Sequence, residues 1–277
     1  MNVIQTSDTT AVRRLETREQ QTAVIDPEVV LTMGMNMAYA HSVWTTADNG
    51  ASGLLYVASG DEDDGDGWLV VLRGPIASGA QKIDSEADGL GVAAVSLVDA
   101  IRAQVGGLFA GVTVPRSPEQ ATALERWKVK PGNDWDLMVC DQAPPLQPNE
   151  SLVRDGLTVG EVQAFLDRVN PHHSVRADDS AVDLWAGIRD ERGGLLAVGA
   201  LTRRRSGVGY LASIATDPVV RGKGYGSAVT AYLTRRVFDA DESQCTLAHY
   251  HPNESARRIY LRLGYRTIAQ NYSCRFA

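Results

Sequence analysis

Apolar side chains recur at regular intervals in the second half of the chain, and their spacing predicts most of its elements. Apolar positions at helical intervals predict an amphipathic helix over Val159–Val169. Three strand-like runs follow at Ala181–Ile188, Leu195–Leu201 and Val208–Ala215, and the segments between them have turn composition. We expect these three runs to form an antiparallel meander.

Helical and extended patterns then alternate up to the C-terminus. Helices are predicted over Ser227–Phe238 and Asn253–Leu263, and strands over Gln244–Tyr250 and Tyr265–Phe276. Gly264 directly follows the second of these helices, where glycine commonly ends a helix. The order after the meander is therefore helix, strand, helix, strand.

A proline-rich segment divides the chain of 277 residues, a length that itself favours two domains. The sequence DQAPPLQPNE over Asp141–Glu150 carries three prolines and no apolar periodicity, so it is interpreted as a linker. The first residues are polar and mixed in charge. We predict a polar N-terminal arm (1–26), a first domain (27–141), a linker (142–150) and a second domain (151–277).

The two halves share sequence features in register. Gly224 and Gly226 lie 135 residues after Gly89 and Gly91, and each pair precedes or opens a helical pattern. Two further pairs are each 141 residues apart, namely Trp44 with Trp185 and Leu54 with Leu195. The chain therefore resembles a duplicated fold.

The charges beside these glycines differ between the halves. Arg221 and Lys223 in the second half correspond to Glu86 and Asp88 in the first. Because carboxylates repel a pyrophosphate at short range, the first half is expected to be a degenerate copy that has lost the ligand.

Composition and charge exclude several classes of protein. Hydrophobic residues make up 44 % and charged residues 22 %, as in ordinary globular proteins, and the net charge of −7 disfavours binding to a nucleic-acid backbone. The N-terminus lacks a signal-peptide core, and no stretch of about 18 apolar residues predicts a membrane span. Three widely spaced cysteines, with no CxxC pair, fit a reducing cytoplasm.

The segment YLASIATDPVVRGKGYGSA joins a predicted strand to a predicted helix through a glycine-rich loop. Glycines let backbone N–H groups approach a ligand closely, and the helix that follows directs its positive dipole end at the same place. Arg221 and Lys223 add full positive charges. This combination is typical of a diphosphate site, although an ordinary strand-to-helix turn has the same glycines.

The spacing fits neither the nucleotide-hydrolase loop nor the dinucleotide-binding GxGxxG loop. Arg221, Gly224 and Gly226 instead match the signature of the GNAT superfamily of N-acetyltransferases, which this region resembles. The later stretch HPNESARRIYLRLGYR is similar to the second motif of that family. Together the two motifs cover most of residues 180–277.

This resemblance implies a fold and an activity. The implied fold class is α+β, with two tandem GNAT-like domains that each have a mixed, mostly antiparallel central sheet flanked by helices. The implied activity is transfer of an acetyl group from acetyl-CoA to a primary amine by direct attack, without a metal. The acceptor is either a small molecule or a protein or peptide amine.

The family also implies where acetyl-CoA binds. Its pantetheine arm lies between the fourth and fifth strands of the domain, which splay apart. The implied coenzyme-binding residues are Ile214, Ala215, Thr216, Arg221, Gly222, Lys223, Gly224, Tyr225, Gly226, Ser227 and Asn253.

Two of the motif residues have more than one interpretation. Tyr260 occupies the family's general-acid position, and a phenol stays protonated at neutral pH, but its spacing is also that of a core aromatic. Asn253 matches an asparagine that caps the second helix and contacts the coenzyme, or only caps the helix.

The general base is not evident, because the predicted fourth strand has no carboxylate where many relatives have one. His249 and His251 flank Tyr250 and should point to the same face of the strand. Either histidine can accept a proton from the amine. A chain of water molecules is the alternative, and both histidines also fit polar positions at a strand end. We take Tyr260 and His249 as the candidate catalytic residues.

A different class of function fits the same motifs. The degenerate first half and the missing carboxylate are also compatible with a non-catalytic acyl-CoA-binding sensor or interaction module. Release of free thiol in the presence of an amine distinguishes the two.

Overall fold

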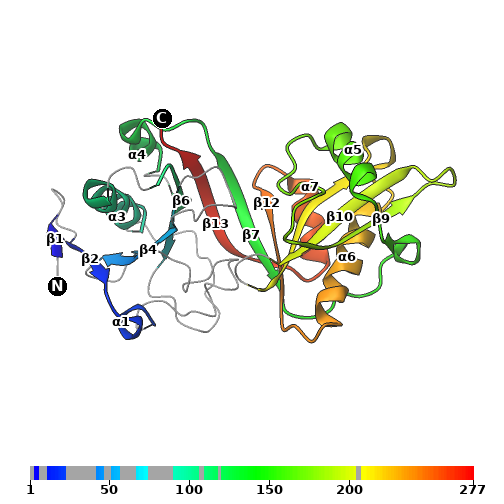
Figure 1. The fold of residues 1–277 in the computed structure, drawn as a ribbon, viewed down its shortest axis with the longest axis horizontal. Helices are drawn as coiled ribbons and strands as arrows, with labels where there is room; N and C mark the ends of the chain where they lie inside the picture. Colours follow the sequence, from blue (N-terminus) through cyan, green and yellow to red (C-terminus); the bar gives the residue numbers. More distant parts are fainter. Residues whose placement is uncertain are drawn as a thin grey trace.

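The computed structural model describes residues 3–5, 11–22, 42–46, 51–56, 67–73, 90–105, 109–117, 120–203 and 207–277. Within these residues, a mixed, mostly antiparallel sheet of 13 strands is flanked by helices, so the fold class is α+β (Figure 1). No helix in this described part is long and apolar enough to cross a membrane.

The first half, up to Cys140, supplies seven strands and three α-helices to the described structure. They are β1 (Val3–Gln5), β2 (Ala11–Leu15), α1 (Arg18–Thr22), β3 (Ser42–Thr46), β4 (Ala51–Tyr56), β5 (Trp68–Arg73), α3 (Leu90–Val105), β6 (Gly111–Pro115), α4 (Gln120–Trp127) and β7 (Asn133–Cys140).

The described elements of the second half follow a short 3₁₀ helix. They are η3 (Glu150–Leu152), β8 (Arg154–Asp155), α5 (Val159–Val169), β9 (Val182–Arg189), β10 (Leu195–Arg203), β11 (Gly209–Thr216), η4 (Pro218–Val220), α6 (Tyr225–Phe238), β12 (Cys245–Tyr250), α7 (Glu254–Arg262) and β13 (Arg266–Arg275).

The last strand of each half pairs with the other half. The strand order is β1-β2-β3-β4-β5-β6-β13-β7-β12-β11-β10-β9-β8. Strand β13 pairs with β6, β7 pairs with β12, and β7 and β13 also pair with each other, all antiparallel. Figure 1 shows β7 and β13 side by side where the two halves meet. Both halves therefore share one continuous sheet.

The residues predicted to be a polar N-terminal arm contain strands instead. Strand β2 pairs with β3, and β1 pairs with β2 at the edge of the sheet. Leu15 is 3 % exposed at the end of β2. The five residues of β2, AVRRL, do not alternate strictly between apolar and polar, so the strand gives a weak sequence signal.

Both halves contain the order strand, strand, strand, helix, strand, helix, strand. The helices α3 and α6 begin at Leu90 and Tyr225, which are 135 residues apart, as the two glycine pairs are. Trp44 in β3 and Trp185 in β9 are both buried. The comparison of Leu54 with Leu195 was wrong in register. Leu54 pairs with Val43, the residue just before Trp44. In the second half, Leu201 pairs with Leu184, the residue just before Trp185, so Leu201 corresponds to Leu54.

The elements predicted in the second half agree closely with the structure. Helix α5 has the predicted bounds and begins with a capping box in which Thr158 and Glu161 each accept from the other's backbone N–H. Strands β9, β10 and β11 form the predicted antiparallel meander. Helix α6 begins two residues before the prediction, at Tyr225, because Gly224 adopts φ 83° and serves as its N-cap.

Helices cover both faces of the meander. Alternate residues of β10 face opposite sides: Ala197 and Leu201 contact the core under α6, and Val198 and Ala200 contact the core under α5. A bulge between Val198 and Ala200 shifts the pairing of β10 with β11 at this point. The bulge lies beside the candidate site.

Candidate active site

The loop between β11 and α6 has the backbone of an anion-binding turn. Gly222 and Gly224 adopt φ values of 82° and 83°, in the left-handed region that favours glycine. Gly224 is the N-cap of α6, and no side chain caps this helix end. The N–H groups of its first turn are therefore left for a ligand, beside the exposed Arg221 and Lys223.

The first turn of α6 lies tightly against the end of β11. A Cβ atom at Gly226 would be 3.0 Å from Thr216 Oγ1, so the glycine permits this close approach. Tyr225 and Ser227 are part of the same turn, and the Ser227 side chain is turned toward the segment before η3. The predicted phosphate-binding residues are thus brought together, with Ser227 held through its hydroxyl by a protein partner.

The segment predicted to be a linker lies against this loop. Asn149 Nδ2 donates to the backbone oxygen of Lys223 at 2.9 Å, and Ser227 Oγ donates to Gln147 Oε1 at 3.2 Å. Arg235 of α6 forms an ion pair with Glu150 and donates to the Pro144 carbonyl oxygen. Residues 144–150 therefore brace the loop and α6.

Strands β11 and β12 separate along their length. Their parallel pairing joins Gly209 with Cys245 and ends at Leu211 with Leu247. Residues Ile214, Ala215 and Thr216 lie beyond that point, and Ala215 and Thr216 pair with β10 on the other edge. The β12 side of this part of β11 therefore has no strand partner in the described sheet.

Ser213 marks the bulge in β11, with φ 49°. Its hydroxyl accepts from the Val175 N–H and donates to the Val175 carbonyl oxygen, both at 3.1 Å. A non-glycine residue with positive φ costs free energy and is kept only where the surroundings hold it. The two bonds hold both the bulge and the loop of residues 170–181 that follows α5.

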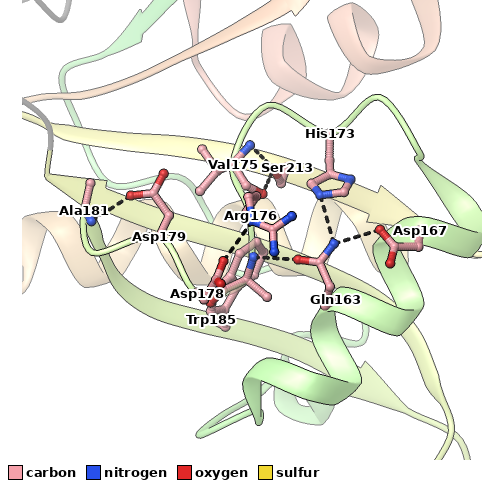
Figure 2. A network of polar contacts seen from close by, with 11 residues as sticks. Gln163, Asp167, His173, Val175, Arg176, Asp178, Asp179, Ala181, Trp185 and Ser213 are labelled. Atoms are coloured by element: carbon pink, nitrogen blue, oxygen red, sulfur yellow. Dashed lines mark hydrogen bonds and ion pairs between the residues drawn. The ribbon is translucent and has the colours of Figure 1, made fainter. Parts of the chain in front are cut away.

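Figure 2 shows how this loop is fixed to α5 and β9. Gln163 of α5 contacts Asp167 at 2.7 Å and His173 at 3.3 Å, and it accepts from the Ala177 N–H at 3.1 Å. The Trp185 indole donates to the Ala177 carbonyl oxygen at 3.1 Å. His173 therefore has a structural role, and hydrogen bonds tie the loop to the strands that it borders.

Tyr260 lies in the core on α7 and is 7 % exposed. Burial raises its pKa well above the ordinary value, and Tyr210 adds to this shift, so the phenol is protonated at neutral pH. Its ring is 5.9 Å from the ring of His249 and 6.0 Å from that of Tyr265, between centroids. The structure therefore places the two candidate catalytic residues next to each other.

His249 and His251 point to the same face, as strand alternation predicted, and both approach Asp136 of β7. His251 Nδ1 donates to Asp136 Oδ2 at 3.0 Å, and His249 Nε2 lies 3.9 Å from the same oxygen. Arg116, which follows β6, reaches Asp136 Oδ1 at 3.5 Å. The Asp136 side chain is 1 % exposed.

Asp136 and Arg116 are residues that sequence reasoning missed. They precede His249 by more than a hundred positions and belong to the first half of the chain. Only the pairing of β7 with β12 places Asp136 opposite His249. A polar aspartate within the otherwise apolar end of the β7 pattern, DLMVC, was the available signal.

The remaining candidates have ordinary structural partners. Asn253 is the N-cap of α7, where its side chain accepts from the Ala256 N–H at 3.2 Å, so capping is confirmed. Gly264, with φ 92°, ends this helix as predicted. Cys140, Cys245 and Cys274 are buried free thiols. No group of three or more His, Cys, Asp or Glu side chains among the described residues could hold a metal ion.

Glu86, Asp88 and Gly89, on which the comparison of the two loops depends, lie outside the described residues. The expectation that the first half does not bind a coenzyme stays a prediction.

Comparison with known proteins identifies the fold. The model of the family described as FR47-like protein matches residues 186–274, from β9 to β13. A GNAT-family acetyltransferase from Colwellia psychrerythraea is similar over 96 % of this chain and 99 % of its own, with 12 % identity and a TM-score of 0.50. A Drosophila protein is similar over 85 % of this chain and 79 % of its own, with 15 % identity and a TM-score of 0.51.

A third structure matches a smaller part of the chain. It is a putative GNAT-family acetyltransferase from Novosphingobium aromaticivorans, with 20 % identity and a TM-score of 0.46 over 53 % of this chain. The match covers 65 % of that protein.

Proposed function

Proceeding from its GNAT-superfamily fold, we propose that the chain is an N-acetyltransferase that moves an acetyl group from acetyl-CoA to a primary amine. The second half carries the site, and the first half binds no coenzyme. One observation carries the proposal. The start of α6 has no side-chain cap, and it lies beside a glycine loop with the exposed Arg221 and Lys223. This loop follows β11, which separates from its parallel neighbour β12.

The phosphate end of acetyl-CoA fits the loop. Backbone N–H groups of Tyr225, Gly226 and Ser227 and the dipole of α6 attract the pyrophosphate, and Arg221 and Lys223 add charge. The two glycines keep the backbone accessible where a side chain would obstruct it. Asn149, by donating to the Lys223 carbonyl oxygen, holds the loop in this form before a ligand arrives.

The pantetheine arm fits between β11 and β12. An extended ligand adds to an open strand edge through main-chain hydrogen bonds, and Ile214, Ala215 and Thr216 present such an edge. The 170–181 loop, tied to Ser213 by two hydrogen bonds, borders the acceptor side. Asn253 lies at the start of α7, the helix that carries Tyr260, and contacts the coenzyme from there.

The acetyl thioester supplies the group that is transferred. The amine nitrogen bonds to the carbonyl carbon, the bond from that carbon to sulfur breaks, and one proton moves from nitrogen to sulfur. Tyr260 donates its hydroxyl proton to the sulfur, and His249 accepts a proton from the amine. His249 and Tyr260 are neighbours, so returning the proton restores both residues.

The test combines binding and turnover. Calorimetry of the full chain with acetyl-CoA should give one bound molecule per chain, and a panel of small amines and peptide N-termini should include acceptors that release free thiol. Tyr260→Phe should lower the rate of thiol release by roughly a hundredfold and leave acetyl-CoA binding unchanged. Two bound molecules per chain would contradict the assignment of the site to the second half.

A second candidate is a non-catalytic acyl-CoA-binding protein. The burial of both Tyr260 and His249 favours it, because catalysis requires reacting groups to reach them. Binding of acetyl-CoA without thiol release with any amine would support this candidate and contradict the enzyme.

A further inference from the structure

A side chain from the segment between the two halves holds one peptide group of the glycine loop. Asn149 Nδ2 donates to the Lys223 carbonyl oxygen at 2.9 Å, and the two residues are 74 positions apart in the chain. Asn149 is the N-cap residue of η3, yet its side chain makes no capping hydrogen bond to that helix. The amide therefore serves the loop and not its own helix.

The backbone of Asn149 also departs from the ordinary. Its φ of 66° and ψ of 1° lie in the left-handed region, which asparagine tolerates better than most residues with a side chain. Contacts on both sides hold the segment in place, because Ser227 donates to Gln147 and Arg235 pairs with Glu150. A strained backbone that its surroundings maintain is a reason to look for a function.

The hydrogen bond from Asn149 fixes the orientation of the peptide between Lys223 and Gly224. In a trans peptide the C=O and N–H bonds point in opposite directions. Because the Lys223 oxygen is directed at Asn149, the Gly224 N–H is directed away from it. No acceptor among the described residues receives a hydrogen bond from this N–H. The N–H is therefore left for a ligand.

Glycine makes the opposite orientation of this peptide accessible. Turning the peptide over changes ψ of Lys223 and φ of Gly224, and glycine adopts either sign of φ. The Lys223 oxygen, with its partial negative charge, would then take the place of the Gly224 N–H. An N–H group binds an oxyanion, whereas a carbonyl oxygen repels it. The bond from Asn149 thus selects the orientation that suits an anion.

We propose that Asn149 is a positioning residue for the coenzyme, which keeps the Gly224 N–H directed at the pyrophosphate. This inference rests on the proposed function. Asn149 lies outside the glycine loop, and its amide acts on the phosphate end of the coenzyme through the Lys223–Gly224 peptide. The segment between the halves thereby contributes to the affinity of the site for the coenzyme.

The size of the effect follows from the two orientations. One hydrogen bond between neutral groups changes the ratio of two conformations by up to about tenfold. The apparent affinity falls in proportion to the fraction of molecules in the binding orientation. Without the bond, that fraction drops by about twofold if the two orientations are then equal, and by up to about tenfold if the turned peptide is preferred.

Asn149→Gly is the test variant, because glycine accepts the left-handed backbone and the substitution removes only the amide side chain. Calorimetry of the full chain with coenzyme A should give a Kd that is higher by a factor between about two and about ten. Leu146→Ala is the matched control, since Leu146 lies on the same segment and is 80 % exposed. Its Kd should equal that of the wild type. Equal Kd values in the wild type and in Asn149→Gly would overturn the proposal.

NMR of the full chain observes the peptide directly, because the chain contains a single Lys-Gly pair. Isotope labelling of the lysine carbonyl carbon and the glycine amide nitrogen therefore gives one carbonyl–amide signal, from Lys223 and Gly224. This signal should move when coenzyme A is added to the wild type. In Asn149→Gly without coenzyme A it should be displaced or split, and in Leu146→Ala it should stay in place. A signal at the wild-type position in Asn149→Gly would contradict a fixed orientation.

Turnover distinguishes positioning from a general loss of structure. With an amine that the wild type acetylates, Asn149→Gly should raise KM for acetyl-CoA by the same factor as Kd and leave kcat unchanged, because Asn149 acts far from the reacting atoms along the coenzyme. A lower kcat with an unchanged KM would rule out this role. If the wild type binds no coenzyme A, the proposed function fails instead, and the Lys223–Gly224 signal of Asn149→Gly still tests the orientation of the peptide.

Discussion

The contact of Glu150 with Arg235 holds the 144–150 segment on α6, and replacing Glu150 by glutamine tests how much it stabilises the protein. The Glu150 carboxylate pairs with Arg235 and accepts from the Gln147 N–H at 2.9 Å. Glutamine keeps the shape of the side chain and removes its charge. Arg235 then lacks its carboxylate partner while most of its side chain stays buried.

The magnitude follows from the exposure of the pair. Exposed ion pairs contribute up to about 1 kcal/mol, and removing one partner of a fully buried pair costs about 3–5 kcal/mol. The Arg235 and Glu150 side chains are 20 % and 7 % exposed, which lies nearer the buried limit. Burial also lowers the pKa of Arg235, as expected for a guanidinium removed from water. We expect the free energy of unfolding to fall by about 2–3 kcal/mol and Tm by roughly 5–10 °C.

Circular dichroism in thermal and urea unfolding measures this change. A double-mutant cycle with Arg235→Gln should give a coupling of about 2 kcal/mol. The matched control is Glu161→Gln, which removes the pair with Arg189, whose side chains are 29 % and 36 % exposed, and it should cost less than about 1 kcal/mol. A coupling no larger than that of the control pair would refute the reasoning. Acetyl-CoA affinity should also fall, because Gln147 and Asn149 contact the loop from the same segment.

Three further predictions concern charge, protonation and backbone conformation. Arg221→Glu should weaken acetyl-CoA binding by roughly a hundredfold at low salt, whereas Arg236→Glu, an exposed cation at the other end of α6, should change it little; equal losses in calorimetry would contradict a local phosphate contact. Burial raises the pKa of Cys245 to about 12 and that of Cys274 to about 11, from a usual value of 9.0. The folded state therefore keeps these thiol protons up to a higher pH than the unfolded state does, so the free energy of unfolding should fall as pH rises from about 9 to about 12. A free energy of urea unfolding that is constant over this pH range would contradict this prediction. Gly224→Ala should cost about 1 kcal/mol because of its φ of 83°, whereas Gly160→Ala, in open space on α5, should stabilise the protein slightly; the opposite order in chemical unfolding would be inconsistent with the strain argument.

The elements of the second half could be predicted from sequence because their signals are local. Helix α5 has an apolar stripe and a capping box, and α7 has Asn253 before it and Gly264 after it, so each helix encodes its own ends. The start of α6 was predicted two residues late because a glycine N-cap leaves no side-chain signal. In the first half, strand β2 was missed because its five residues, AVRRL, do not alternate strictly between apolar and polar.

The loop Arg221–Gly226 was also found from sequence, since backbone freedom and charge are properties of single residues. Its brace was not. The segment DQAPPLQPNE has the composition of a linker, and only its docking on α6 reveals partners for Asn149, Gln147 and Glu150. Composition reports that a segment forms no regular element, and it carries no information on what the segment contacts.

Sequence by itself thus determined the elements of the second half and the glycine loop with its cations, because periodicity, caps and charges act between near neighbours. The tertiary structure alone decided what surrounds His249. Strand β7 of the first half pairs with β12 of the second, and β13 returns to β6. Strand pairing joins backbones through hydrogen bonds that are the same for any side chain, so no local pattern records that Asp136 lies opposite His249. Only the exchange of strands between the halves brings this carboxylate of the first half beside a histidine of the second.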